Sequence, residues 1–394
     1  MVERCGAGLA LGHLCQSDTA AIIVERMVKV MLSRKFHDSY PDQTNLLVGL
    51  RLILERTLPG NICLGPEHLE QVGLALLEGL RNYTNTDQGD VGSHVRRAAM
   101  EAFVPFVKTG SCAWLIPQII GGLLMQSVEK IDRIRLCAGT TLQEIVHLDI
   151  LIPEKEKLSI LLGDQIHWQS PASVFPQMVP LLYIDSYRAP LLAGLVSSAG
   201  GMSESLIRHA GGSLIDFLIA ATEEIKYEVS KELLVLFKDN HHVDRITLPL
   251  LEVLRQMFEA ELFHGLQYDE LLPQLALAIR QEHQSIKDVR KLTACSKVLC
   301  ALAPVPAPET QRLVWGQVLR FLTHGSPKVR IVTSEHLYLA ISASPIDDSE
   351  EIEDLLLNTD WSEPLAVLRP LVFALYPRFG LSPPKLIKPN PIKS

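Results

Sequence analysis

A short local pattern recurs along the chain and constrains its fold more than any other feature. A β-branched residue is followed by an arginine, and a small residue lies three positions later, near the start of an expected amphipathic helix. The five arginines are Arg96, Arg135, Arg208, Arg290 and Arg330. They are 39, 73, 82 and 40 residues apart, close to one, two, two and one period of about 40 residues. This period is typical of two-helix HEAT or armadillo-like repeats and predicts an all-α solenoid.

An aspartate precedes the first of these arginines. Asp90 lies six residues before Arg96, where HEAT repeats place an aspartate that caps free N–H groups and meets an arginine of an adjacent repeat. Because each arginine keeps the same place in its repeat, we interpret Asp90 and the five arginines as contacts between repeats rather than as a binding surface. A pattern this short also arises by chance, so the alternative is a generic helical bundle.

The composition supports helices and argues against a nucleic-acid partner. Hydrophobic residues make up 47% of the chain but aromatic residues only 6%, which suits packed helices better than sheets. The net charge is -8, whereas tracking a phosphate backbone needs a clustered excess of lysine and arginine.

Capping residues, prolines and glycines predict the helix boundaries. Helices are expected at 18–36, with Asp18 as N-cap, and at 43–58, 66–83 and 91–108. Further helix starts are expected at Ser170, Ser186, Ser203 and Thr310. The pairs Gly200–Gly201 and Gly211–Gly212 are expected to end helices or to mark close packing.

The repeat array is expected to cover residues 1–380 and to be followed by a disordered tail. Residues 381–394 hold four prolines among lysines, a composition that cannot continue a packed helix. At the other end, the helix expected at 18–36 is apolar on all but a narrow stripe, so it needs neighbours on several sides. Since a terminal repeat should have a polar outer face, we expect the chain to begin within a longer array.

Two further features bear on the compartment. The most apolar window, 113–125, falls short of the roughly 20 residues of a membrane span, and the N-terminus lacks a secretory signal. The seven cysteines are odd in number and contain no CxxC pair, so we interpret them as buried reduced thiols. We therefore expect a cytoplasmic protein.

Motifs for catalysis and cofactor binding are absent from the sequence. There is no GxxxxGK[ST], HExxH or GxSxG, so we expect no enzyme, no catalytic residue and no cofactor. His241 and His242, with Asp239 and Asp244, could supply metal ligands. No distant cysteine or histidine partner is indicated, so we interpret them as a solvated turn and expect no metal site.

Three residues at expected helix boundaries are candidates for partner binding. They are Trp168, Tyr187 and Arg188, because aromatic residues and arginine are common interface anchors. For Trp168 we prefer a structural role, since it directly precedes the helix start at Ser170 and could pack on its first turns. For Tyr187 and Arg188 the structural and the partner-binding roles are equally open.

Four stretches carry a resemblance to a known family. They are DVGSHVRRAAMEAF (90–103), SVEKIDRIRLCAG (127–139), HWQSPASVFPQ (167–177) and SYRAPLLAGLVSSAGGMSESLIRHAGGSL (186–214). In wording and order they resemble the C-terminal region of the tubulin-folding cofactor D family, also called tubulin-specific chaperone D. The likeness covers most of the chain from about residue 20, and weakens after Phe379.

The resemblance implies a helical-repeat chaperone that binds β-tubulin. With partner cofactors and an Arf-like small GTPase, such a protein assembles or dismantles the αβ-tubulin heterodimer, and it contributes to GTPase activation only as part of a complex. The resemblance also implies a place in the cytoplasm, at the cytoskeleton or at the centrosome. Family members are far longer, and this chain resembles only their last third. A general HEAT-repeat scaffold with a non-tubulin client is the main alternative, and a helical enzyme is a third.

Overall fold

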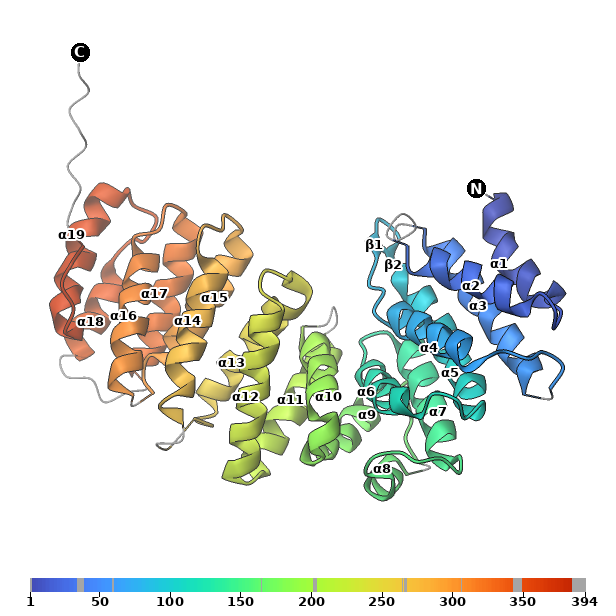
Figure 1. Cartoon of the computed structure of the whole chain (residues 1–394). Coiled ribbons are helices and arrows are strands. Elements are labelled where there is room, and N and C mark those ends of the chain that lie inside the picture. The colour runs from blue at the N-terminus through green and yellow to red at the C-terminus, as the bar shows by residue number, and fades with distance from the viewer. Residues whose placement is uncertain are drawn as a thin grey trace, which may run out of the picture. The chain divides into compact units, whose positions relative to one another are not determined.

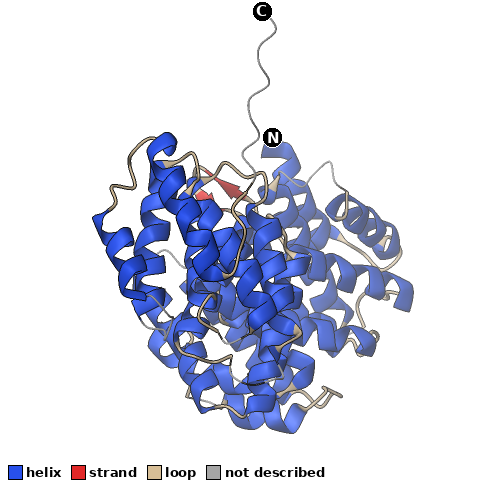
Figure 2. Cartoon of the chain, turned by 90° about the vertical axis from the view of Figure 1, so that its left-hand side faces the viewer, coloured by secondary structure: helices blue, strands red, loops and turns tan. Residues whose placement is uncertain are grey.

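A computed structural model describes most of the chain. The described residues are 2–33, 39–58, 60–163, 165–200, 204–263, 265, 268–305, 307–342 and 349–384. They form two compact units, Met1–Leu214 and Ile215–Ser394, built almost entirely from α-helices (Figures 1 and 2). The predicted all-α repeat fold is thereby confirmed.

The first unit is built from two rows of helices. Its helices are α1 (Val2–Leu14), α2 (Ala20–Met31), α3 (Tyr40–Thr57), α4 (Pro66–Leu80), α5 (Gly92–Lys108), α6 (Ile116–Ser127), α7 (Asp132–His147), α8 (Lys155–Leu162), α9 (Pro171–Met178) and α10 (Asp185–Ala199). In one row α1, α3, α5 and α7 pack on one another in order, and in the other α2, α4, α6 and α10 do so. Each repeat thus contacts mainly its neighbours, as a solenoid requires.

Smaller elements interrupt these rows. A two-stranded antiparallel hairpin, β1 (Asn85–Thr86) and β2 (Gly89–Asp90), joins α4 to α5. The 3-10 helix η2 (Ala113–Leu115) precedes α6, and η3 (Val179–Tyr183) follows α9. Between α7 and α10 the regular arrangement of two helices per repeat is interrupted, because α8, α9 and η3 are inserted there and pack on one another.

The second unit repeats the arrangement of two rows. Its helices are α12 (Glu223–Asp239), α13 (Asp244–Glu259), α14 (Leu271–His283), α15 (Val289–Leu302), α16 (Pro308–Leu322), α17 (Pro327–Ser342), α18 (Ser349–Asn358), α19 (Leu365–Leu375) and the 3-10 helix η5 (Tyr376–Phe379). Helices α13, α15 and α17 pack in one row, and α12, α14 and α16 in the other. Helix α11 (Glu204–Ala220) contains the boundary between the units.

The helix predictions hold best where proline or a clear loop sets the boundary. The helices expected at 66–83 and 91–108 correspond to α4 and α5, and Ser170 is the N-cap of α9. A helix end at Gly200 is also confirmed, since Gly200 is the C-cap of α10.

Other predicted boundaries are wrong. The first described helix is α1, and α2 begins after Thr19 rather than at Asp18. Thr310 lies inside α16, which begins at Pro308, because proline at a first helical position needs no N–H partner. Two further predicted helix boundaries lie inside helices instead. They are Ser186, which is the second residue of α10, and Gly211–Gly212, which lie within α11. Ser203, Gly201 and residues 385–394 of the expected tail lie outside the described residues.

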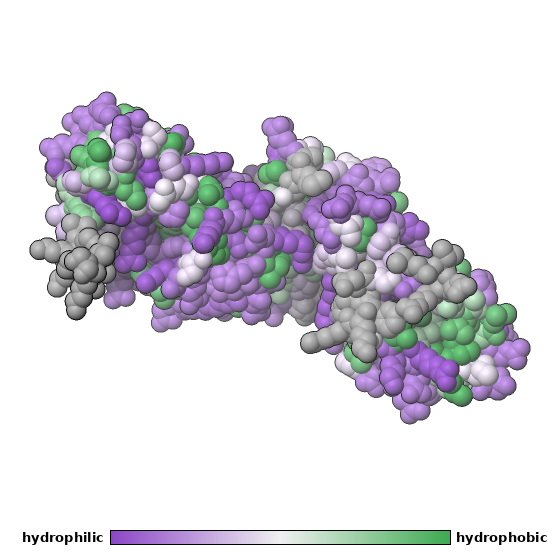
Figure 3. Space-filling model, turned by 90° about the horizontal axis from the view of Figure 1, so that it is seen from above, coloured by the Kyte–Doolittle hydropathy of each residue, from purple (hydrophilic) through white to green (hydrophobic). Residues whose placement is uncertain are grey.

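The helix expected to need neighbours on several sides buries only one face. In α2 the buried side chains include Val24 and Met27, whereas Ile22 is 56% exposed. Leu14 of α1 is also exposed, and hydrophobic residues gather at the right-hand end of Figure 3, which carries these helices. That the chain begins within a longer array stays a prediction.

The described cysteines differ in how far they are buried. Cys295 and Cys300 are buried, and burial raises the pKa of both thiols, so they are protonated and unreactive at neutral pH. Cys63 is exposed, which corrects the expectation of buried thiols for that residue. Within the described residues, no helix combines the length and the apolar character that crossing a membrane demands.

The packing of α7 depends on a glycine beneath a tryptophan. A Cβ atom on Gly139 would lie 2.0 Å from Cδ2 of Trp168, whose side chain is only 4% exposed. Only glycine allows the indole ring to lie this close to the backbone of α7.

Gly139→Ala is therefore expected to lower the free energy of unfolding by about 1–3 kcal/mol, because the buried ring has to move. The matched control is Gly212→Ala, since no atom lies within 4 Å of a Cβ at Gly212 inside α11. Alanine there should be neutral or stabilising by up to about 1 kcal/mol. Urea unfolding followed by circular dichroism measures both, and equal midpoints for Gly139→Ala and wild type would show that the contact is not tight.

Candidate functional site

Three of the five predicted repeat arginines are buried where the prediction placed them. Arg96 and Arg135 are 0% exposed, and Arg330 is 2% exposed, each near the start of its helix. A buried guanidinium must have its five N–H groups paired, so its partners define the site.

Arg135 and Arg330 make nearly the same hydrogen bonds. In each, Nη1 donates to the carbonyl of the residue six positions earlier, Glu129 at 2.8 Å or His324 at 2.8 Å. In each, Nε donates to a tryptophan carbonyl in the following turn, Trp168 at 3.1 Å or Trp361 at 2.9 Å. Nη2 extends this contact to the next carbonyls of the same turn. One side chain thus joins the preceding loop to the following turn.

Arg96 combines side chains with one carbonyl, since its Nη1 also donates to the carbonyl of Asn82 at 2.7 Å. Its guanidinium makes a two-pronged ion pair with Asp90, at 3.2 and 2.8 Å, and Nε donates to Oε1 of Gln126 at 3.1 Å. It also lies 4.2 Å from the ring centroid of Tyr83. Asp90, which precedes the N-cap residue Val91, accepts from the N–H of Ser93 at 3.1 Å. Its arginine partner belongs to the same repeat, not to an adjacent one as expected.

The other two predicted arginines are corrected by the structure. Arg208 and Arg290 have side chains 73% and 77% exposed, and they pair at the surface with Glu204 and Asp288. In α15 the buried cation is the next residue, Lys291, which is 3% exposed. The local pattern therefore matched Arg290 while the buried position had shifted by one residue.

Arg188, predicted as a partner contact, belongs with the buried arginines. It is 5% exposed, its Nε donates to the carbonyl of Leu182 at 2.9 Å, and its Nη1 pairs with Asp185. Leu182 lies six positions earlier, the same offset as for Arg135 and Arg330. The pattern missed it because Tyr187 precedes it and Leu191 follows three positions later, where a β-branched and a small residue were required.

Trp168 and Tyr187 also lie in the interior. Nε1 of Trp168 donates to Oε1 of Gln143 at 3.0 Å, which favours the structural alternative for this residue. Tyr187 is 0% exposed, and its hydroxyl donates to the carbonyl of Pro153 at 2.8 Å. Burial, assisted by Glu154, raises the pKa of Tyr187 to about 12, so the phenol stays a neutral donor. All three predicted contacts thus stabilise the fold in this structure.

The loop that Tyr187 holds carries the most exposed apolar side chain among the described residues. Leu151 is 87% exposed, although the loop 149–154 is fixed on two sides. Tyr187 holds the carbonyl of Pro153, and Nζ of Lys155 donates to the carbonyls of Leu148 and Ile150, at 2.5 and 3.5 Å. The backbone of this loop is therefore held in place while the side chain of Leu151 lies in solvent.

Two elements that follow the loop also carry exposed apolar side chains. Ile160 of α8 is 79% exposed and Tyr183 of η3 is 51% exposed, and α8 packs on η3. We call Leu151, Ile160 and Tyr183 the α8 surface. Sequence reasoning missed it, but periodicity could have found Ile160, because Leu158 and Leu162 are buried two residues to either side.

The two histidines expected in a solvated turn meet a buried carboxylate. Glu282 of α14 is 0% exposed and accepts from Nδ1 of His241 at 2.5 Å and from the backbone N–H of His242 at 3.0 Å. Ligand atoms of these three residues lie within 4.8 Å of one another. Nζ of Lys291 lies 2.8 Å from Glu282 and also pairs with Asp244, so an ammonium group already neutralises the carboxylate. The arrangement is a buried ion-pair cluster joining α13, α14 and α15.

A shallow apolar groove lies between α17 and α18 in the second unit. Its volume is about 440 Å³, and its lining includes Ile331, Tyr338, Leu339, Leu356, Leu357 and Trp361. Leu339 is 60% exposed, so this groove is a second apolar surface.

Comparison with known proteins shows that residues 117–291 are similar to one family. A family model described as "Tubulin folding cofactor D C terminal" matches residues 117–291. A tubulin-specific chaperone D from Dictyostelium discoideum is 25% identical over 226 residues, which cover 48% of this chain and 15% of the relative. The chain therefore spans only a small part of the length of that relative. The α8 surface and all members of the Glu282 cluster lie within the matched residues.

Arg135→Met is expected to lower the free energy of unfolding by about 3 kcal/mol, because carbonyls of two loops lose their buried donor. Arg290→Met removes the same charge from the surface and should leave the unfolding midpoints close to those of wild type. Thermal and urea unfolding compare the two, and a similarly small effect at Arg135 would contradict a structural role.

The Glu282 cluster predicts a pH dependence of stability. Burial alone would raise the pKa of Glu282, but hydrogen bonds from Lys291, the His242 backbone and His241 lower it below its usual value of 4.5. Its contribution to stability is therefore present above the unfolded-state pKa and is lost as pH falls through the lower folded-state pKa. Glu282→Gln should lower the melting temperature near neutral pH and flatten its decline as pH falls below the usual value of 4.5.

The control for this prediction is Glu67→Gln, whose side chain is 78% exposed. It should keep the wild-type acid profile in melts at a series of pH values. An unchanged profile for Glu282→Gln would mean that this carboxylate does not drive the acid sensitivity.

Proposed function

We propose that this chain is a tubulin-folding cofactor segment that binds β-tubulin and partner cofactors, because residues 117–291 match the family model described as "Tubulin folding cofactor D C terminal". It would act in the assembly and disassembly of the αβ-tubulin heterodimer. The family match is the observation that carries this proposal. The name of the relative, tubulin-specific chaperone D, supports the same client.

The α8 surface is the contact that we assign to the client. It lies inside the matched residues, and its most exposed residue, Leu151, is on an anchored loop, so little conformational entropy of this loop is lost on binding. Large exposed apolar side chains on an otherwise well-packed array are typical of interaction surfaces. The predicted anchors Trp168, Tyr187 and Arg188 then act indirectly, by supporting the elements that carry this surface.

Binding rather than catalysis is the proposed mode of action. The side chains of the four buried arginines form hydrogen bonds inside the array, which argues against any of them reaching a nucleotide on an Arf-like small GTPase. They are Arg96, Arg135, Arg188 and Arg330. A contribution to GTPase activation would therefore require the assembled complex. The proposed setting is the cytoplasm and its cytoskeleton.

A general helical-repeat scaffold with a non-tubulin client remains the second candidate. The groove between α17 and α18 favours it, because this apolar surface lies beyond residue 291, outside the family match. Interaction mass spectrometry that enriches other proteins and leaves tubulin at background would support the scaffold.

The test is capture of radiolabelled β-tubulin by the immobilised chain. Leu151→Asp combined with Ile160→Asp should reduce capture at least tenfold, because each buried aliphatic side chain contributes about 1.5–3 kcal/mol. Tyr187→Phe should reduce capture less, since it releases the loop without changing its apolar residues.

The matched control is Leu339→Asp combined with Val367→Asp, two exposed residues of the second unit, at 60% and 52%. This variant should capture β-tubulin as well as wild type does. Loss of capture in the control alone would move the client to the second unit, and no capture by the well-folded wild-type chain would refute the proposal.

A further inference from the structure

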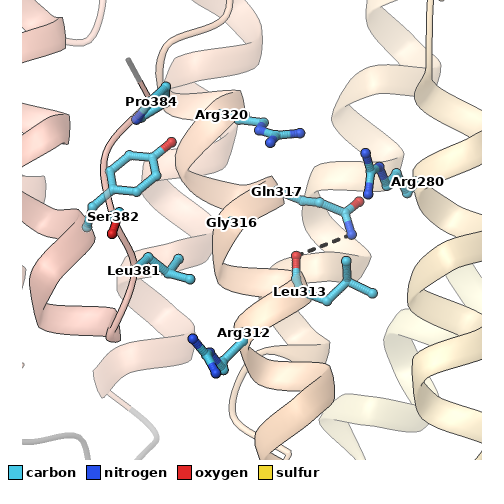
Figure 4. A pocket seen from close by; sticks show the side chains of 10 residues that line it. Arg280, Arg312, Leu313, Gly316, Gln317, Arg320, Leu381, Ser382 and Pro384 are labelled. Carbon is cyan, nitrogen blue, oxygen red and sulfur yellow. Dashed lines mark hydrogen bonds between the residues drawn. The ribbon is translucent and has the colours of Figure 1, made fainter.

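Three arginines of the second unit line one groove without a carboxylate partner. Arg280 comes from α14, and Arg312 and Arg320 come from α16 (Figure 4). The groove has a volume of about 270 Å³, and its other wall includes Leu381, Ser382 and Pro384. Within the part of the chain that the structure describes, none of the three guanidinium groups forms a salt bridge.

A buried hydroxyl group lines the same groove. Tyr376 of η5 is 4% exposed, and its Oη has no hydrogen-bond partner among the described residues. Burial raises the pKa of Tyr376, against the opposing influence of Arg320, so the phenol stays protonated and can donate. Burying a hydroxyl group without a partner is unfavourable, and a bound acceptor would remove that cost. Three cations and a free donor together point to an anionic ligand.

The spacing of the arginines indicates an extended ligand rather than a single anion. Arg312 and Arg320 are eight residues apart on α16, which corresponds to about 12 Å along the helix axis. Figure 4 shows them at opposite ends of this stretch of α16. Their guanidinium groups also point in opposite directions in Figure 4, so one phosphate group would not contact both in this arrangement. An extended peptide rises about 3.3 Å per residue, so carboxylates three to four residues apart would match.

The rest of the lining also favours a peptide. Leu313, Leu381 and Pro384 give the groove apolar walls, which would contact aliphatic parts of a peptide but add nothing to the binding of a bare anion. The residues that follow the groove in sequence, 385–394, contain three lysines and no aspartate or glutamate. The side chains of this segment therefore offer no carboxylate to the arginines.

We propose that this groove binds an acidic peptide segment of a partner protein, with carboxylates at Arg312 and Arg320 and a further acceptor at Tyr376. Arg280 adds positive charge from the neighbouring helix. The groove shares no residue with the α8 surface, and only Arg280 of its lining falls within residues 117–291. The inference therefore goes beyond the tubulin proposal and can fail or hold independently of it.

The experiment measures fluorescence anisotropy of fluorescein-labelled octaglutamate with the full chain. Wild type should bind saturably and lose affinity as salt is raised, whereas labelled octalysine should not bind. Arg312→Gln combined with Arg320→Gln should weaken binding at least tenfold. Tyr376→Phe should weaken it two- to fivefold, with an unchanged circular dichroism spectrum.

The control removes the same charge elsewhere in the unit. Arg290→Gln combined with Lys328→Gln changes two exposed cations that do not line the groove, and it should bind as wild type does. Equal loss in this control would mean that overall charge drives binding, and it would overturn the site. Absence of wild-type binding would also overturn it. Displacement of the peptide by inorganic phosphate at equal concentration would replace the peptide site with a single-anion site.

Discussion

The buried arginine near the start of a repeat helix is the interaction on which the rest of the array depends. Helix ends leave carbonyl groups without intrahelical partners, and a tight turn between helices brings several of them together. A planar guanidinium with five donors can pair with such a group of carbonyls, and lysine cannot reproduce this geometry. Arg135 bonds Glu129 before it and Trp168 and Gln169 after it, so a single side chain holds three consecutive segments in place.

This interaction explains which parts of the fold could be predicted from the sequence. The spacing of Arg96, Arg135 and Arg330 reflects a physical requirement that recurs once per repeat, so the period and the all-α class followed from it. Burial, however, depends on whether neighbouring turns bring acceptors to the side chain. Arg208 and Arg290 satisfy the local pattern but meet only a nearby surface carboxylate, while Arg188 and Lys291 occupy buried positions with different neighbours in sequence.

In the candidate site, too, residue type could be read from the sequence but burial could not. Trp168, Tyr187 and Arg188 were predicted from residue type, since aromatic residues and arginine serve both interfaces and cores. Only the structure shows that all three side chains are buried and make internal contacts. The exposed residues Leu151 and Ile160 have the chemistry of core residues, and their position outside the core follows from the insertion between α7 and α10, which the two-helix period does not anticipate.

The buried network and the exposed surface therefore have separate roles that are linked through Tyr187. The network fixes the backbone, Tyr187 fixes the loop 149–154, and the loop holds Leu151 in solvent. Under the proposed function, the client would meet a surface that is already formed, and the unbound chain would keep these apolar side chains in water.

Hydrogen–deuterium exchange of the chain with and without β-tubulin tests the central claim most directly. Residues 149–183 hold the loop, α8 and η3, and their backbone amides report on the α8 surface. The account predicts slower exchange in this segment when β-tubulin is bound, with the second unit unchanged. Unchanged exchange in 149–183 in the presence of bound β-tubulin would contradict it.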